Sequence, residues 1–305
     1  APPASQPLSV QLLAPDADDW RSVAGAWASL FSRRPDASPY LSPIWMQTWL
    51  ETYGTALRPE LFSASLPGQD LIGACFLTCL TRRQTILPHV RMHLNCDGEP
   101  AGHGVVVQHN SILAAPGRED DVVQALARHI ALRRVDELAA SGFDEKGIHR
   151  LISAFPDWIA EVDWREAHYV DLDHLRATGA DHAGSLSRNT REQLRRSLKL
   201  YRERGDLHLE AATTVDQAEA MMNELLALHE THWQSKGQGG GFASDWRRKF
   251  HKAYIRTALP QGAVQLLRVT AGAETIGVLY NLVANGKVNF YQSGLRYDPD
   301  GRFKP

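Results

Sequence analysis

The segment LHETHWQSKGQGGGF at residues 228–242 places two histidines ahead of a glycine-rich run. His229 and His232 are three residues apart, whereas the zinc-binding HExxH motif of metalloproteases needs histidines four apart. No third ligand accompanies them, so the pattern argues against zinc. A histidine at the end of a helix can act as a general base or a substrate contact, and it can equally stabilise the helix C-terminus. The glycine run predicts a mobile loop that closes over a site, and it lacks the Lys-Ser/Thr ending of a P-loop.

Polar side chains interrupt two strand-like segments near the C-terminus. They are Tyr280, Asn281, Tyr291, Gln292 and Ser293. Such residues indicate either a sheet edge or a site. The second strand leads into a turn at 298–301, which is followed by Arg302, Lys304 and Pro305. A proline after a turn often opens a helix, and a helix N-terminus binds anions. We interpret this junction as part of a cofactor site.

The most charged stretch, residues 185–205, predicts a helix with a row of cations on one face. The row consists of Arg188, Arg191, Arg195, Lys199 and Arg202. These cations can grip a phosphate-bearing ligand such as CoA or RNA, or they can form a solvated helix face. Ser187 or Asn189 can cap the helix where its backbone N–H groups favour an anion. A smaller polar cluster, Gln108 to Asn110, is either structural or part of a site.

Two helices followed by a three-strand antiparallel meander occur twice along the chain. In the first half the helices are 16–34 and 42–54, and the strands are 60–66, 71–80 and 90–96. In the second half the helices are 214–237 and 245–259, and the strands are 263–269, 275–283 and 288–295. Asn285-Gly286 predicts a two-residue hairpin turn. Between the halves we predict a helix at 120–132 and strands at 150–156 and 161–173.

The composition is that of an ordinary soluble protein, with 43% hydrophobic and 22% charged residues and a net charge of -2. This charge gives no global attraction to nucleic acid or membrane. The longest apolar run, residues 71–80, is too short to span a bilayer. Cys75, Cys79 and Cys96 show no metal-ligand or CxxC spacing, so we expect buried thiols in a reduced compartment.

Four stretches together resemble one family. They are LSPIWMQTWLETYG, LSRNTREQLRRSLKLY, LHETHWQSKGQGGGFA and FYQSGLRYDPDGRFKP. The resemblance is to the CelD/BcsL-like acetyltransferases associated with bacterial cellulose and exopolysaccharide synthesis, GNAT-superfamily relatives of the Fem transferases. It implies an α/β (α+β) fold of tandem GNAT-like lobes, each a mixed, mainly antiparallel sheet flanked by helices. We expect a disordered leader at 1–8, an N-terminal lobe at 9–180 and a C-terminal lobe at 181–305 that lacks its last helix and strands. A chain ending there would hold only part of a CoA site.

The resemblance also implies a reaction and its residues. Acetyl-CoA or another acyl-CoA is the expected co-substrate, without metal, and the acceptor is an amine of a small molecule or sugar. His229 is expected as base or acceptor contact, and Tyr291 or Tyr280 as proton donor. The expected CoA contacts are Gln292, Ser293, Gly294, Arg302 and Lys304. The expected acceptor-site residues are Trp45, Asn110, Arg188, Asn189, Trp233, Lys236, Phe242 and Asn281.

Two other functions stay open on the sequence. One is a Fem-like transferase that uses aminoacyl-tRNA, which the basic helix favours and the lack of a long heptad run disfavours. The other is a non-catalytic module in polysaccharide assembly. We expect a cytoplasmic protein that contacts no DNA and spans no membrane, with oligomerisation possible.

Overall fold

The chain folds into two compact units, each built from separate stretches of sequence. A computed structural model describes residues 8–13, 17–68, 70–83 and 88–303. The first unit comprises residues 1–158, 241–265 and 281–290, and the second comprises 159–240, 266–280 and 291–305. The predicted boundary near residue 180 divides the chain along its sequence, and it stays a prediction.

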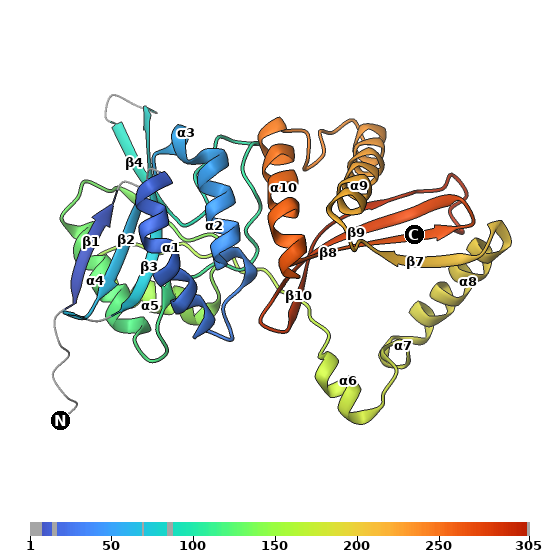
Figure 1. The fold of residues 1–305 in the computed structure, drawn as a ribbon, viewed down its shortest axis with the longest axis horizontal. Helices are drawn as coiled ribbons and strands as arrows, with labels where there is room; N and C mark the ends of the chain where they lie inside the picture. The colour runs from blue at the N-terminus through green and yellow to red at the C-terminus, as the bar shows by residue number, and fades with distance from the viewer. Residues whose placement is uncertain (1–7, 14–16, 69, 84–87, 304–305) are drawn as a thin grey trace. The chain divides into compact units, whose positions relative to one another are not determined.

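The first sheet is mainly antiparallel, with strand order β1-β2-β3-β4-β6 and with β5 paired to β3. Figure 1 labels β1, β2, β3 and β4 of this sheet. Only the pairing of β4 with β6 is parallel among the described strands. The strands are β1 (Ser9–Leu13), β2 (Glu60–Ser65), β3 (Leu71–Arg83), β4 (Pro88–Leu94), β5 (Leu113–Ala114) and β6 (Glu137–Ala139).

The helices of the first unit begin where the sequence supplies caps. Ser42 accepts a hydrogen bond from the backbone of Trp45, and Pro43 follows it, so α2 starts there. A π-helical turn at Leu50–Gly54 extends this helix. The helices of this unit are α1 (Ala17–Ser32), α2 (Pro43–Trp49), α3 (Thr55–Leu57), α4 (Glu119–Ala131), α5 (Glu145–Ala154) and α10 (Asp245–Ala258), with 3-10 turns at Pro39–Leu41 and Leu259–Gln261.

The second sheet has the strand order β10-β9-β8-β7. Its strands are β7 (Leu207–Ala211), β8 (Val264–Ala271), β9 (Glu274–Ala284) and β10 (Lys287–Leu295). The predicted hairpin turn between β9 and β10 is confirmed, because Asn285 and Gly286 have φ angles of 51° and 72°, as a type I′ turn requires. In the strand order of this sheet, β10 is a terminal strand.

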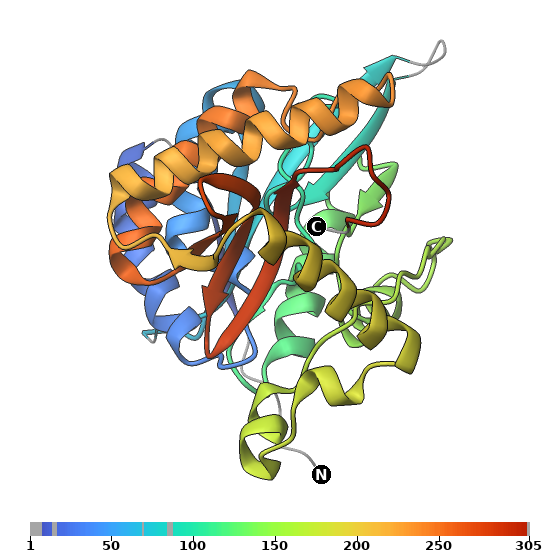
Figure 2. The same cartoon turned by 90° about the vertical axis from the view of Figure 1, so that its right-hand side faces the viewer.

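Four helices follow one another through residues 172–235. They are α6 (Leu172–Thr178), α7 (His182–Ser185), α8 (Arg188–Arg204) and α9 (Val215–Ser235). Thr214 and Gln217 form a reciprocal capping box at the start of α9. Figure 2 shows α9 as the long helix beside the strands of the second sheet. The close approach is made at Gly294 of β10, where an added Cβ would lie 2.4 Å from the carbonyl oxygen of Leu225.

The predicted α/β class with mixed, mainly antiparallel sheets flanked by helices is confirmed, and two element predictions are wrong. Residues 150–156 belong largely to α5, because Asp144 caps a helix that runs on to Ala154. The predicted strand at 161–173 forms no ladder, and α6 begins at Leu172 within it. An alternating pattern becomes a strand only where a partner edge accepts it.

The prediction that the cysteine thiols are buried is correct for two of the three cysteines. Cys75 and Cys96 are buried free thiols, whereas Cys79 is exposed near the end of β3. Among the described residues, no helix is long and apolar enough to cross a membrane. Within the same residues, no cluster of His, Cys, Asp and Glu is arranged to hold a metal ion.

Candidate active site

The C-terminal end of α9 holds His229 in a defined orientation. His229 is buried, and its Nε2 accepts a hydrogen bond of 3.0 Å from the indole N–H of Trp233. A neutral imidazole has one donor and one acceptor nitrogen, so this bond places the proton on Nδ1. The tautomer leaves Nε2 occupied as an acceptor, which favours a positioning or hydrogen-bonding role over proton abstraction at that nitrogen.

Gly240, which belongs to the glycine-rich run, packs against the rings of His229 and Trp233. An added Cβ at Gly240 would lie 2.6 Å from Cε1 of His229 and 2.9 Å from Cδ1 of Trp233. Any larger residue would displace the two rings, so glycine is required here by space. The ammonium of Lys236 lies 5.5 Å from the Trp233 ring centroid, a cation–π distance.

The two tyrosines form a buried pair on neighbouring strands. Tyr280 of β9 is fully buried, Tyr291 of β10 is 6% exposed, and their ring centroids are 5.3 Å apart. Tyr291 is therefore the better placed of the two to approach a ligand. Its neighbour Gln292 lies on the opposite face of β10, because side chains alternate along a strand.

The outer edge of β10 presents a backbone donor. The N–H of Arg296 points inward to the carbonyl oxygen of Ile276 on β9, at 2.8 Å. The N–H of Ser293 donates to the side-chain oxygen of Gln292, at 3.0 Å. An amide carbonyl thus already meets a backbone donor of this terminal strand.

The turn after β10 pairs its charges internally. The guanidinium of Arg302 bonds both carboxylate oxygens of Asp300, and this pairing, with a backbone hydrogen bond, lowers the pKa of Asp300 to about 2. Arg204 of α8 pairs with Asp298 at 2.5 Å and lies 3.7 Å from the ring centroid of Phe303. The predicted CoA contact Lys304 lies outside the described residues.

Residues 188–305 match the family model described as an acetyltransferase (GNAT) domain. The chain contains a GNAT-type acetyltransferase domain. The predicted superfamily and the predicted enzyme class are therefore confirmed, while the narrower CelD/BcsL-like assignment stays a prediction. The matched stretch begins at α8 and includes α9, β9, β10 and the turn that follows β10.

Solved structures also align with the chain at low identity. The ribosomal-protein-alanine N-acetyltransferase from Brucella melitensis biovar Abortus 2308 is 15% identical, with 53% of this chain and 98% of that chain covered and a TM-score of 0.32. The aminoglycoside N-acetyltransferase AAC(6')-Iy in complex with CoA is 15% identical, with 55% and 97% covered and a TM-score of 0.31. A conserved protein of unknown function from Bacteroides thetaiotaomicron VPI-5482 is 11% identical, with 94% and 80% covered and a TM-score of 0.49. No curated protein matches the chain.

Two residues expected in the acceptor site, Trp45 and Asn110, are buried in the first unit. Trp45 is fully buried and packs edge-on against Phe250 and Tyr254, so it belongs to the core of the first unit. Asn110 is buried, accepts a hydrogen bond from Asn95 and donates to backbone carbonyls. These bonds fit the structural interpretation of the polar cluster Gln108 to Asn110. The sequence could not separate these roles, because burial depends on contacts between distant segments.

The other expected acceptor residues have mixed environments. Asn281 donates to the side chain of Gln265 at 3.1 Å. Phe242 is buried and packs against the ring of His251. Arg188 is exposed and pairs with Glu192 one helical turn further along, while Asn189 is exposed beside it. Within residues 188–305, the expected residues that the structure brings together are His229, Trp233 and Lys236 at the end of α9, and Tyr280 with Tyr291 on β9 and β10.

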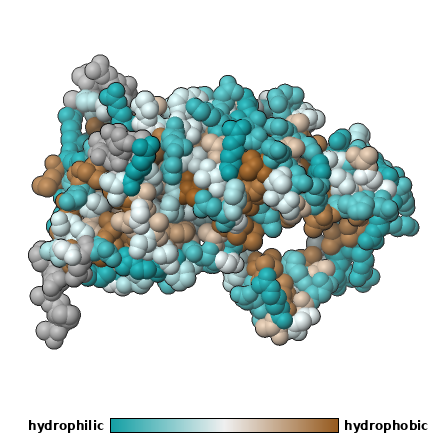
Figure 3. Space-filling model, in the orientation of Figure 1, coloured by the Kyte–Doolittle hydropathy of each residue, from teal (hydrophilic) through white to brown (hydrophobic). Residues whose placement is uncertain are grey.

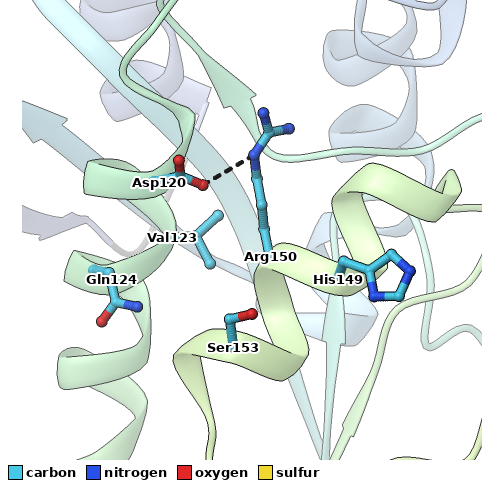
Figure 4. Close-up of a pocket in the computed structure, with 6 residues that line it drawn as sticks. All are labelled: Asp120, Val123, Gln124, His149, Arg150 and Ser153. Atoms are coloured by element: carbon cyan, nitrogen blue, oxygen red, sulfur yellow. Dashed lines mark hydrogen bonds and ion pairs between the residues drawn. The ribbon is translucent and has the colours of Figure 1, made fainter.

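Two open hollows in the first unit were not predicted from the sequence. One, of about 360 Å³, lies between α4 and α5, where Arg150 pairs with Asp120 at 3.0 Å and so has its charge balanced (Figure 4). The other, of about 180 Å³, is lined largely by apolar groups and includes the stacked rings of Tyr53 and Trp246. Their lining residues come from separate segments that show no motif in the sequence.

Proposed function

We propose that the chain is an acyl-CoA-dependent N-acyltransferase that transfers acetyl from acetyl-CoA to an amine of a small molecule or sugar. The observation that carries this proposal is the match of residues 188–305 to the acetyltransferase (GNAT) domain family. A cytoplasmic location, a role in exopolysaccharide synthesis and a division into two GNAT-like lobes at residue 180 are parts of the same proposal. They rest on the resemblance of the four sequence stretches.

The outer edge of β10 fits the pantetheine arm of acetyl-CoA. The arm contains two amide groups, which can add to an exposed sheet edge as a peptide strand does. The N–H of Ser293 already donates to the amide oxygen of the Gln292 side chain. A pantetheine carbonyl would replace that oxygen and release the Gln292 side chain. Ser293 and Gln292 are therefore the residues we assign to the arm.

The turn after β10 supplies the cation for a phosphate. Arg302 is exposed and forms the fork that suits phosphate oxygens. It must exchange the carboxylate of Asp300 for the ligand, because that carboxylate occupies the guanidinium in the structure. Before the phosphate binds, Asp300 thus pairs with the guanidinium of Arg302 and keeps it oriented.

The bound acetyl-CoA supplies a thioester carbonyl for attack by the acceptor amine. The amine nitrogen forms the new bond to the acyl carbon, the carbon–sulfur bond breaks, and CoA leaves as a thiol. The phenol of Tyr291 is the group we assign to donate the proton that the sulfur needs. His229, held by Trp233, is the residue we assign to orient the acceptor, and a proton from the amine passes to solvent water.

The proposal is tested by calorimetric titration of acetyl-CoA and by the release of free thiol with a panel of amines. Ser293→Pro removes the backbone N–H of residue 293, and proline is tolerated in edge strands. Ser293→Ala is the matched control, because it keeps the N–H and changes only the side chain. We expect acetyl-CoA to bind at least about tenfold more weakly to Ser293→Pro than to Ser293→Ala, the effect of one lost hydrogen bond. Equal binding by both variants contradicts the assigned edge.

The same assay separates the donor classes. Thiol release that depends on acetyl-CoA supports the proposed function. Transfer from aminoacyl-tRNA with no response to acetyl-CoA would establish the Fem-like reaction instead. Failure of the chain to bind either donor would leave a non-catalytic role in polysaccharide assembly.

A further inference from the structure

The segment Ile159–Leu172, named the strap here, exposes an unusual amount of apolar surface. Ile159 is 100% exposed, Tyr169 is 87% exposed and Trp164 is 55% exposed. Val162, Val170 and Leu172 are also exposed. Large apolar side chains that gather on a surface generally mark an interaction site. Figure 3 shows apolar side chains on the surface where α6 continues from the strap.

Among the described residues, the hydrogen bonds and ion pairs of the strap are local. Arg165 pairs with Asp163 at 3.2 Å, and Asp171 caps the first turn of α6 through the N–H of His174. Figure 2 shows the strap as a yellow-green loop before α6 that no strand accompanies. Its sequence alternates as a strand does, with Val162, Trp164 and Val170 in phase. The strap thus has the alternating pattern of a strand, but it pairs with no strand among the described residues.

Helix α8 has the complementary chemistry in the same unit. Of its residues, Ser197 and Tyr201 are buried, while Leu194 and Leu198 are 43% and 37% exposed. Residues 188–204 contain seven basic and two acidic side chains, whereas residues 159–172 contain four acidic and one basic. At 100° per residue, Arg195 and Arg202 lie beside the two leucines on one side of α8. This side therefore joins an apolar strip to a basic one.

We propose that the strap of one copy of this chain docks on the exposed Leu194–Arg202 side of α8 in a second copy. The aromatic and aliphatic groups of the strap cover the two leucines, and its carboxylates pair with the arginines. A two-fold dimer makes the contact twice, since each copy contributes one strap and one helix. The occupant is a second copy because both complementary surfaces are present on each chain and both are uncovered in the structure.

The arginines of this side are available for such pairing. Arg195 and Arg202 have no ion-pair partner among the described residues, in contrast to Arg188 and Arg204. On the strap, Glu161 has no ion-pair partner in the described part of the chain, and the carboxylate of Glu166 lies 3.9 Å from His168. Opposite charges across an interface fix its register and suppress wrong partners. The proposal therefore predicts an association that weakens as salt rises.

Sedimentation equilibrium and light scattering of the full 305-residue chain test the proposal. The expected mass is that of a dimer at low salt, with a dissociation constant that rises with salt. Trp164→Ser should raise this constant about 30-fold or more, as the loss of an aromatic hot spot does. Leu132→Ser is the matched control, because Leu132 is 88% exposed in the first unit and should leave the constant unchanged. A wild-type chain that is monomeric at every concentration overturns the proposal.

A charge exchange makes the test specific to these two surfaces. Glu161→Arg with Glu166→Arg reverses the strap, and Arg195→Glu with Arg202→Glu reverses the helix. Each double variant alone should be monomeric with a melting temperature close to that of the wild type. An equimolar mixture should recover the dimer mass, because one contact is wild type and the other has both charges reversed. Variants that stay dimeric alone, or a mixture that stays monomeric, rule out the docking.

Discussion

The indole N–H of Trp233 donates to Nε2 of His229 across 3.0 Å, one turn along α9. The bond fixes both the ring orientation and the tautomer of the histidine. Gly240 packs so closely on the two rings that an added Cβ would lie 2.6 Å from the imidazole. Tryptophan, histidine and glycine therefore act as one structural unit, in which a change at any member alters the geometry of the others.

Replacement of His229 by alanine should lower the rate of acyl transfer at least about tenfold, the low end of the contribution of a proton-handling or orienting group. Trp233→Phe should produce a smaller loss, because it keeps a ring beside Gly240 and removes only the N–H donor. The measurement is steady-state thiol release at saturating acetyl-CoA across pH 6 to 9. We expect the loss in Trp233→Phe to stay smaller than that in His229→Ala at every pH in this range.

The unfolding free energy of both variants in urea is the control for this prediction. A loss of activity that parallels a loss of stability would assign His229 a structural role alone. Unchanged turnover in His229→Ala would remove the histidine from the mechanism.

Gly294 offers a test of how β10 is held against α9. Its added Cβ would lie 2.4 Å from the backbone oxygen and 2.7 Å from Cα of Leu225, and backbone atoms cannot move aside as a side-chain end can. Gly294→Ala should therefore destabilise the protein by about 1–3 kcal/mol, the usual cost of overpacking. Gly184→Ala is the matched control, because nothing lies within 4 Å of its added Cβ. Urea unfolding of the two variants gives the comparison, and equal midpoints would contradict the close approach.

The sequence predicts the periodic elements of this protein well, because their patterns are local. The helices predicted at 42–54 and 214–237 and the turn at Asn285-Gly286 each depend on residues a few positions apart, and the structure has these elements. The strand predicted at 161–173 failed for the opposite reason. Its alternation is real, but a ladder needs a distant partner edge that no local pattern specifies.

The environments of the site residues were harder to predict than the elements. Trp45 and Trp233 look alike in sequence, since each stands in an amphipathic helix near polar residues. The structure buries Trp45 among Phe250 and Tyr254, and it leaves Trp233 half-buried beside a histidine and a glycine loop. Only contacts between segments about 200 residues apart decide that Trp45 belongs to the core.

The three cysteines should differ sharply in reactivity. Burial raises the pKa of the Cys75 and Cys96 thiols, so both are protonated and shielded. Cys79 is exposed, although partial desolvation also raises the pKa of its thiol. A thiol reagent at pH 8 should therefore modify one cysteine slowly in the native protein and all three in urea. Cys79→Ser should abolish the native reaction, and a second native equivalent would show that the buried thiols are accessible.

His251 should make the protein less stable in mild acid. It is completely buried beside the rings of Trp45, Phe242 and Phe250, and burial lowers its pKa to about 3, with a smaller contribution from the charge of Arg247. The unfolded chain binds a proton at this residue near pH 6.5, whereas the folded chain does not. The stabilisation is thus complete above pH 6.5 and is lost as the pH falls towards the folded value.

The difference can be measured by urea unfolding at pH 7.5 and pH 5.0. This histidine should contribute a loss of about 2 kcal/mol between the two conditions, from 1.36 kcal/mol per pH unit below the unfolded pKa. His251→Phe keeps an aromatic ring and cannot titrate, so its unfolding free energy should fall by about 2 kcal/mol less than that of the wild type. The comparison uses the change with pH, which separates titration from any repacking that phenylalanine causes. An identical pH dependence in the two proteins would mean that His251 gains a proton in the folded state, and that its site admits water.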